Sequence, residues 1–249
     1  MKILVTGSSS GLGKFLSENL KCDVFNRNKN FESLEYDVII HCAWDCRNTV
    51  NQRDLLDYVN NNIFLTKRLI EELKFKKMIF LSSVDVYPKN SDRIESSDID
   101  VNLIKNIYGK SKLICEEIVK KSQNYLILRS AGIIGKNKLP KGILNIFKNG
   151  ETTLTSDSVV NYITHGDILS VINQYINCDI IKNETINVTS DTSLYMKEME
   201  CFVYPIKYGT YNYDVDFVDN TKFKNCFPNI KLDSSKNNLS CILKELEYI

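Results

Sequence analysis

Short apolar runs alternate with amphipathic stretches through the first half of the chain. The apolar runs predict buried strands, and the stretches between them, where apolar residues recur every three or four positions, predict helices. The predicted strands cover residues 2–6, 22–26, 37–42, 77–82 and 124–129, and the predicted helices cover 11–20, 54–74 and 106–121. Apolar strands that alternate with helices indicate an α/β fold, with a parallel sheet covered on both faces.

After Arg129 the pattern is less regular, and the connections become polar and rich in lysine and asparagine. Helices are predicted at 141–149, 166–177, 193–201 and 236–246, and strands at 184–189 and 211–218. We therefore expect a main domain over residues 1–131, joined by about 166–190. A smaller lobe, formed by 132–165 and 191–249, is expected to supply substrate contacts.

Composition narrows the functional classes. With 249 residues, 43% of them hydrophobic, the chain can bury one substantial core and a small lobe. Its 32 basic and 31 acidic residues include no basic block, so we expect no nucleic-acid partner. The apolar run Ile3 to Val5 is too short for a signal peptide or a membrane span, so we expect a cytoplasmic protein without a membrane partner. The eight cysteines show no paired CxxC spacing, which predicts reduced thiols and no metal site.

A glycine-rich turn follows the first strand and opens the first helix. Three glycines at this place allow a tight turn, and they let a pyrophosphate approach the positive end of the helix. An ordinary strand-to-helix turn is the alternative. The residues expected to bind the cofactor here are Gly7, Ser9, Ser10, Gly11, Leu12 and Gly13.

The end of the second predicted strand indicates which dinucleotide is preferred. An acidic residue there would bind a ribose diol, whereas a cation without a carboxylate favours a 2′-phosphate. Asn26 and Arg27 stand at this position. They predict a preference for NADP(H), with NAD(H) still possible, although Arg27 could also be a solvated surface charge.

Tyr108 and Lys112 form the strongest chemical signal. Four residues apart, they fall on one face of a helix, where the ammonium can favour the ionised phenol. Ser82 and Ser83 end the strand that precedes this helix. The order of nucleotide site and proton-transfer site is the one that a dehydrogenase needs.

Taken together, these motifs resemble the extended short-chain dehydrogenase/reductases, and within them the epimerase/dehydratase group that acts on nucleotide sugars. The resemblance extends over nearly the whole chain. It rests on the glycine turn, the segments 37–43, 83–88, 128–135 and 162–167, Tyr108, Lys112 and the strand at 186–188.

The resemblance implies a Rossmann-type doubly wound sheet and three catalytic residues. Tyr108 would be the general acid or base, Lys112 would tune it and hold the nicotinamide ribose, and Ser83 would bind the reacting carbonyl or alcohol. Tyr108 and Lys112 would also contact the cofactor, together with Cys42 and Ala43.

The chain departs from this family in two places. Only nine residues separate Arg27 from Asp37, so we expect one edge strand of the sheet to be absent. Before Tyr162 the family often has an arginine that holds the substrate diphosphate, but this chain reads Val159-Val160-Asn161. Lysines at 136, 138 and 141 are candidates to replace it.

The residues after Ser83 help to choose among reactions. Val84 replaces an acid of the dehydratases, and Asp85 replaces a cysteine of the epimerising fucose synthases. We therefore expect an NADPH-dependent reductase of a 4-keto, 6-deoxy nucleotide sugar. An NAD-retaining 4-epimerase and a non-catalytic dinucleotide-sensing regulator are the alternatives. A nucleotide sugar is the expected partner, and a homodimer is left open.

Four further residues follow predicted strand ends, where ligands of parallel sheets collect. Trp44, Asp85, Tyr87 and Ser130 are the candidate substrate contacts. Trp44 could instead pack beneath the lobe, and Asp85 could instead cap its loop. For Asn62, in the long central helix, we expect a structural hydrogen-bonding role.

Overall fold

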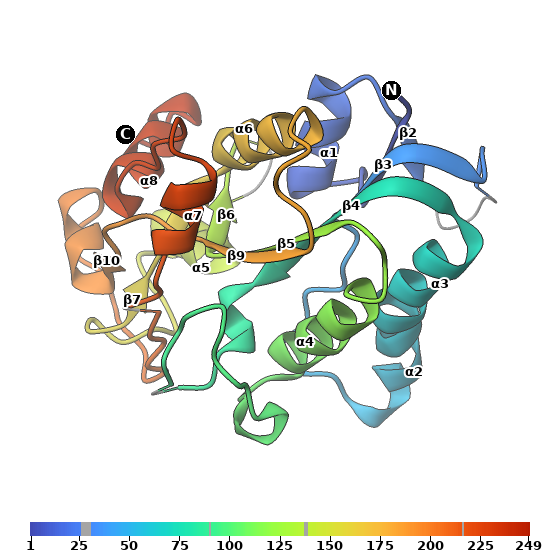
Figure 1. Cartoon of the computed structure of the whole chain (residues 1–249). Helices are drawn as coiled ribbons and strands as arrows, with labels where there is room; N and C mark the ends of the chain where they lie inside the picture. Colours follow the sequence, from blue (N-terminus) through green and yellow to red (C-terminus); the bar gives the residue numbers. More distant parts are fainter. Residues whose placement is uncertain (26–30, 90, 137–138, 216) are drawn as a thin grey trace.

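A six-stranded parallel sheet forms the centre of the molecule in the computed structural model, which describes residues 1–25, 31–89, 91–136, 139–215 and 217–249 (Figure 1). The strand order is β2-β1-β3-β4-β5-β9. The strands are β1 (Ile3–Thr6), β2 (Asp23–Phe25), β3 (Glu35–His41), β4 (Lys74–Ser83), β5 (Tyr125–Ser130) and β9 (Glu184–Val188). This confirms the predicted Rossmann-type sheet.

In the usual Rossmann order a further strand lies outside the equivalent of β2. In the described part of the chain, β2 is the outer strand, and β3 follows it directly in the sequence. The described residues thus show no strand outside β2, as predicted from the short connection between Phe25 and Glu35.

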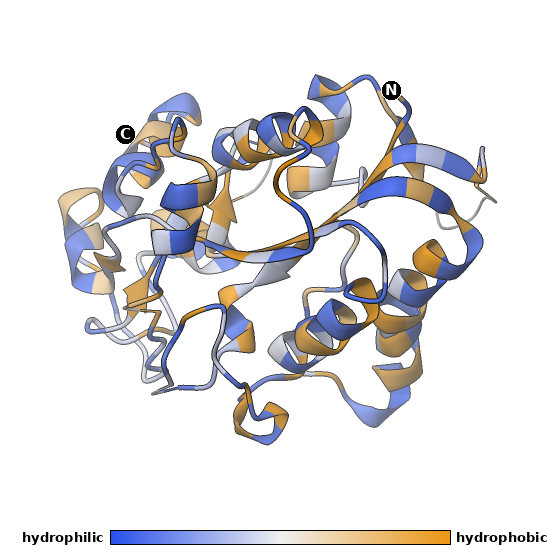
Figure 2. Cartoon of the chain, viewed as in Figure 1, coloured by the Kyte–Doolittle hydropathy of each residue, from blue (hydrophilic) through white to orange (hydrophobic). Residues whose placement is uncertain are grey.

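The strands form where the apolar runs were expected, because both faces of the sheet are covered. Val38, Ile39 and Ile40 are at most 1% exposed, and the parallel pairing of β3 with β1 sets Ile40 beside Val5. In Figure 2 the central strands are mostly hydrophobic, whereas the flanking helices carry both hydrophobic and hydrophilic residues.

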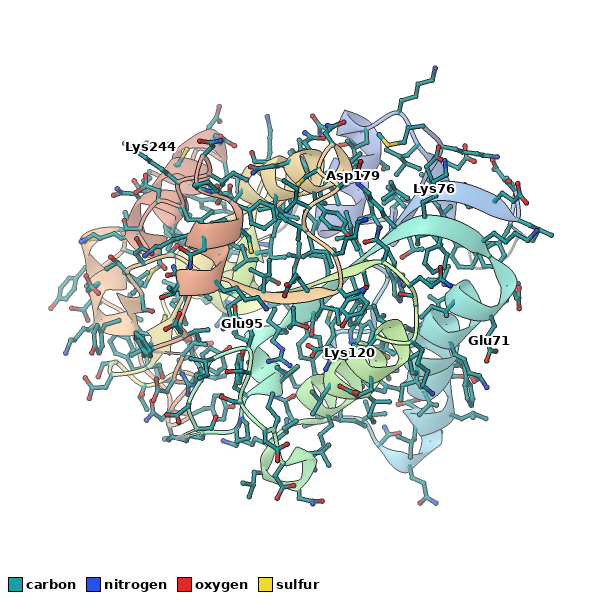
Figure 3. The ribbon with its side chains drawn as sticks, viewed as in Figure 1. Glu71, Lys76, Glu95, Lys120, Asp179 and Lys244 are labelled. Atoms are coloured by element: carbon teal, nitrogen blue, oxygen red, sulfur yellow. The ribbon has the colours of Figure 1, made fainter. Side chains whose placement is uncertain are left out.

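Helices cover both faces of the sheet. On one face, α1 (Gly11–Asn19) and α6 (His165–Ile176) contribute Leu16 and Ile168 to the largest hydrophobic cluster. On the other face lie α3 (Leu65–Glu72) and α4 (Ile107–Val119). Charged side chains such as Glu71, Lys120 and Lys244 point to the outside (Figure 3) and are exposed.

The long helix predicted over residues 54–74 contains an irregular turn. It begins with a 3-10 turn, η1 (Gln52–Asp54), and continues as α2 (Leu55–Val59). A π-helical turn, η2 (Asn60–Phe64), then leads into α3. Such wide turns often occur near functional sites, and here the turn contains the buried Asn62.

The second half of the chain differs from the sequence-based expectation in three segments. Residues 193–201 form the short strand β10 (Leu194–Tyr195) and a 3-10 helix, η5 (Met196–Cys201), in place of one α-helix. In the predicted strand 211–218, the described residues make only isolated bridges, through Tyr211 and Asp214. Helix α7 (Thr221–Cys226) was not predicted.

The remaining elements build two small sheets and two helices. Strand β6 (Gly132–Ile134) pairs with β8 (Tyr162–Thr164), and β7 (Val159–Val160) pairs with β10. Helices α5 (Lys141–Asn149) and α8 (Ser235–Glu245) share a second hydrophobic cluster with these strands. The division into two domains stays a prediction.

No helix of the described ranges has both the length and the apolar character of a membrane span.

Candidate functional site

A cavity of about 380 Å³ opens at the carboxyl ends of the central strands. This is the edge of an open parallel sheet at which ligands usually bind. Its lining includes the glycine turn after β1, the segment after β3, the end of β4 and the first residues after β5. Two side chains of α4, Tyr108 and Lys112, complete one wall.

The glycine turn has the shape that a phosphate cradle requires. Gly7 has a φ of 78° and Gly11 one of 55°, in the left-handed region. A Cβ atom on Gly7 would lie 2.7 Å from the nitrogen of Ala43, and one on Gly13 would lie 2.3 Å from the carbonyl oxygen of Gly7. Side chains here would therefore displace the backbone.

Helix α1 begins directly at this turn, and its first residues line the cavity. The N-cap Ser10 makes no capping hydrogen bond through its side chain. The first amides of a helix have no partner within the helix, and they lie at the positive end of its dipole. Gly11, Leu12 and Gly13 therefore fit a dinucleotide phosphate, as the sequence predicts.

Tyr108 is placed by the start of α4. The N-cap Asn106 accepts a hydrogen bond of 2.7 Å from the amide of Gly109, which starts the helix just before the tyrosine. A Cβ atom on Gly109 would lie 2.1 Å from the carbonyl oxygen of Asp85. The glycine thus lets the turn after β4 approach the helix, and Ser83 comes close to Tyr108.

Burial controls the protonation of Tyr108. Burial raises the pKa of its phenol well above the usual value, and the neighbouring Cys46 and Asp85 raise this pKa further. A hydrogen bond with Ser83 acts in the opposite direction but is weaker. The phenol therefore holds its proton more firmly than a free tyrosine does.

Lys112 is buried, at 3% exposure, one helical turn after Tyr108. Its ammonium donates to the carbonyl oxygen of Leu81 and lies 3.6 Å from the ring centroid of Trp44. The Tyr108 ring centroid is farther away, at 5.8 Å. Burial lowers the pKa of Lys112 from 10.5 to about 8.

The segment after β3 is fixed by side chains that are themselves buried. The hydroxyl of Thr6 accepts hydrogen bonds from the amides of Cys42 and Ala43, at 3.1 and 3.0 Å. Asn62 accepts from the amide of Asp45 at 2.7 Å and donates to the same residue's carbonyl at 3.2 Å. This is the structural role expected for Asn62. Thr6 holds Cys42 and Ala43, which line the cavity.

Three of the four predicted substrate contacts, Trp44, Asp85 and Ser130, line the cavity. Asp85 does not cap its loop through its carboxylate. That group accepts a hydrogen bond of 2.9 Å from the hydroxyl of Tyr213, while the backbone amide of Asp85 donates to Ser83. Burial raises the pKa of the Asp85 carboxyl.

Tyr87 is the exception and lies outside the cavity lining. Its ring is buried, and its hydroxyl donates to Asn187 at 2.8 Å and accepts from Arg129 at 2.9 Å. Arg129 also forms a buried ion pair with Glu116 at 2.7 Å, and Glu116 accepts a hydrogen bond from Ser82. Tyr87 thus belongs to a polar network beneath the ends of β4 and β5.

Several lining residues were not found from the sequence: Cys46, Asn48, Ala131, Gly132, Ile133, His165 and Tyr213. The imidazole of His165 stacks on Phe15, with 5.2 Å between ring centroids. Tyr213 lies in the irregular segment that was predicted to be a strand. The motif around 162–167 was a usable signal for His165, but no sequence pattern pointed to Tyr213.

Some predicted residues cannot be placed. Asn26, Arg27 and Lys138 lie outside the described residues. Lys136 and Lys141 are exposed and do not contribute to the cavity lining. In the described ranges, His, Cys, Asp and Glu side chains form no group of three that could hold a metal ion.

Comparison with known proteins agrees with this architecture. Residues 6–168 match the NAD dependent epimerase/dehydratase family. A search of curated proteins finds no match.

Solved structures share the fold over the full chain length. UDP-glucuronic acid 4-epimerase from Bacillus cereus, solved as a mutant with a fluorinated UDP-glucuronic acid and NAD, has a TM-score of 0.81 and 17% identity over 99% of both chains. The dTDP-4-dehydrorhamnose reductase from Bacillus anthracis, solved with NADP, has a TM-score of 0.78 and 17% identity over 98% of both chains.

RMD from Pseudomonas aeruginosa, complexed with NADPH, has a TM-score of 0.73 and 19% identity over 99% of this chain and 100% of its own. The family match covers most of the central sheet and the whole glycine turn. The chain belongs to the NAD dependent epimerase/dehydratase family.

Proposed function

We propose that this protein is an NADPH-dependent reductase that acts on the 4-keto group of a 6-deoxy nucleotide sugar. One observation carries the proposal. The glycine turn lines the same cavity as Ser83, Tyr108 and Lys112, so a dinucleotide on the turn and a carbonyl at Tyr108 would share one enclosed space. Production of precursors for surface glycans, in the cytoplasm, is the expected setting.

The proposed chemistry needs a proton donor beside the carbonyl. Tyr108 is protonated at neutral pH because burial raises its pKa, so it can donate to the alkoxide that forms during reduction. The Ser83 hydroxyl accepts from the amide of Asp85 and forms a hydrogen bond with Tyr108, so both hydroxyls can contact one substrate oxygen. The buried Lys112 ammonium supplies positive charge next to the developing negative charge.

The cofactor would be held by backbone atoms and by Lys112. The free amides of α1 and the close-packed glycines fit its phosphates, and Cys42 and Ala43 border the same space. When bound, NADPH supplies the hydride.

The preference for NADP(H) rests on Asn26 and Arg27, which the structure does not describe. We expect Arg27→Ala to weaken NADPH binding about 10-fold to 150-fold, because a charge-assisted contact with the 2′-phosphate is worth about 1.5 to 3 kcal/mol. NADH binding should change little. Titration of both dinucleotides checks this, and an equal loss for both would refute the NADP preference.

A 4-epimerase that retains NAD is the second candidate. The likeness to the UDP-glucuronic acid 4-epimerase from Bacillus cereus favours it, and it would use the same three side chains. Reduction needs Tyr108 only as a proton donor, whereas an epimerase also needs it to remove a proton from an alcohol. A non-catalytic dinucleotide sensor has no use for Tyr108 in the cavity.

One experiment separates these functions. The purified protein is analysed for bound dinucleotide and is then incubated with NADPH and a panel of 4-keto nucleotide sugars, with loss of NADPH absorbance and product analysis as readouts. A reductase consumes one NADPH per sugar. Tightly retained NAD with interconversion of two sugars indicates the epimerase. Dinucleotide binding without any turnover would reject both enzymes.

A further inference from the structure

The Lys112 ammonium is buried without a carboxylate partner. Among the described residues, no acidic side chain comes within ion-pair distance of it, and its hydrogen-bond partner is the carbonyl oxygen of Leu81. Burial of an unpaired charge is costly, so other groups must stabilise this cation. The aromatic rings of Trp44 and Phe80, with centroids 3.6 and 4.8 Å from the ammonium nitrogen, are in position to do so.

The indole of Trp44 is held firmly in this position. Its ring lies 5.7 Å from the Phe80 ring and 6.3 Å from the His41 ring, as centroid distances. The following residue, Asp45, is held by two hydrogen bonds to Asn62. These ring contacts and the anchored Asp45 support the placement of the indole face on Lys112.

We propose that Trp44 is a positioning residue for Lys112. The indole face of Trp44 holds the Lys112 ammonium at the cavity wall and keeps it protonated. The inference goes beyond the prediction that Trp44 contacts substrate. It also differs from simple packing, because the contact is specific to a cation and an electron-rich ring. A cation over a ring face is held by the ring's quadrupole, and the attraction is strongest where water is excluded.

Several other titratable groups surround Lys112, and the test must separate their titration from that of Lys112. They come from the segment after β3, from α4 and from β3 itself. These groups are Cys42, Cys46, Cys115, Glu116, His41 and Tyr108. Asp85 lines the same cavity and raises the pKa of Tyr108 through its charge.

The first test uses the fact that Trp44 is the single tryptophan of the chain. Its emission in the wild-type protein should change with a midpoint near pH 8, where the Lys112 ammonium loses its proton. Lys112→Met and Lys112→Arg should both abolish this transition, the first by removing the cation and the second by making it permanent. Circular dichroism verifies that each variant is folded.

Two matched controls make this result specific. Lys110→Met removes a lysine from the same helix, and Cys46→Ser removes a thiol that interacts with Lys112 and with the Trp44 backbone; each should leave the transition in place. A transition that persists in folded Lys112→Arg, or a wild-type emission that is constant from about pH 6.5 to 10, would overturn the proposal. This test does not depend on enzyme activity.

The second test rests on the proposed function and compares Trp44→Leu with Trp44→Phe. In Trp44→Leu the aromatic ring is lost, and the alkaline limb of the pH profile of turnover should move about one pH unit lower. This corresponds to about a tenfold change in the proton equilibrium of Lys112. In Trp44→Phe, which keeps a smaller ring, the shift should be less. A purely structural role would admit water to Lys112 and move the limb to higher pH. Such an upward shift in both variants would overturn the proposal.

Discussion

At the scale of single residues, burial sets the charge of the groups at the cavity. The phenol of Tyr108 stays protonated because burial raises its pKa, whereas burial lowers the pKa of Lys112 to about 8. The sequence predicted these two residues from their spacing on a helix. It could not predict that the ammonium would lie on Trp44, because that contact joins elements that are distant in the chain.

Replacement of Tyr108 by phenylalanine should reduce turnover about 100-fold or more while dinucleotide binding is nearly unchanged. The change removes one proton donor, and general acid catalysis contributes on this scale. Steady-state kinetics and dinucleotide titration provide the measurement. Tyr125→Phe, at the start of β5 and outside the cavity lining, is the matched control. Normal turnover by Tyr108→Phe would rule out Tyr108 as the acid.

His41 should make the folded state sensitive to acid. Burial, together with the nearby Lys112 ammonium, lowers its pKa from 6.5 to about 3. The unfolded chain therefore binds a proton that the folded chain does not, and the free energy of unfolding falls as the pH drops from about 6.5 towards 3.

We expect the substitution His41→Gln to remove this dependence. Urea denaturation between about pH 4 and 6.5 should give a slope against pH that is smaller than that of the wild type by up to about 1.4 kcal/mol per pH unit. The neutral ring bridges Thr6 and Thr66 at 2.8 and 2.9 Å, so some stability is also lost at neutral pH. Identical slopes would show that His41 already takes up its proton in the folded protein.

At the scale of elements, regular strands and helices were predictable, and irregular segments were not. Helix α4 begins at Ile107, within one residue of the expected start, because Asn106 and its bond to Gly109 are local signals. The segment around Tyr213 has no such signal. Its path is set by distant contacts, including the amide of Tyr213 donating to Ser158 and its hydroxyl donating to Asp85.

The close approach of α4 to the turn η3 (Val84–Val86) should depend on Gly109. An added Cβ would lie 2.1 Å from the carbonyl oxygen of Asp85, so Gly109→Ala must move the backbone that carries Ser83. We expect a loss of about 1–3 kcal/mol of unfolding free energy and a lower turnover.

Gly142→Ala is the control for this effect. Gly142 is also helical, in α5, but an added Cβ there would meet no atom within 4 Å. Thermal or urea unfolding of the two variants gives the comparison. Equal stability of both would mean that η3 can move away from α4 at little cost.

At the scale of the whole molecule, the site is assembled from the central sheet and from the segments that follow it. The parallel order brings the glycine turn, Ser83 and Ser130 to one edge, and Ser83 pairs with Ser130 in the register of β4 and β5. That edge was predictable, because strands that alternate with helices place their carboxyl ends together. The contribution of Tyr213 was not predictable, since it depends on how the second half of the chain packs.

Transfer of isotope from cofactor to sugar tests the central claim most directly, namely that the dinucleotide and the reacting carbonyl share this cavity. The protein is incubated with a 4-keto nucleotide sugar and NADPH deuterated on the transferred position of the nicotinamide. We predict a product with one deuterium on the former carbonyl carbon, seen by mass spectrometry and NMR. A converted sugar without deuterium, or no conversion of any keto sugar in the panel, would contradict the account.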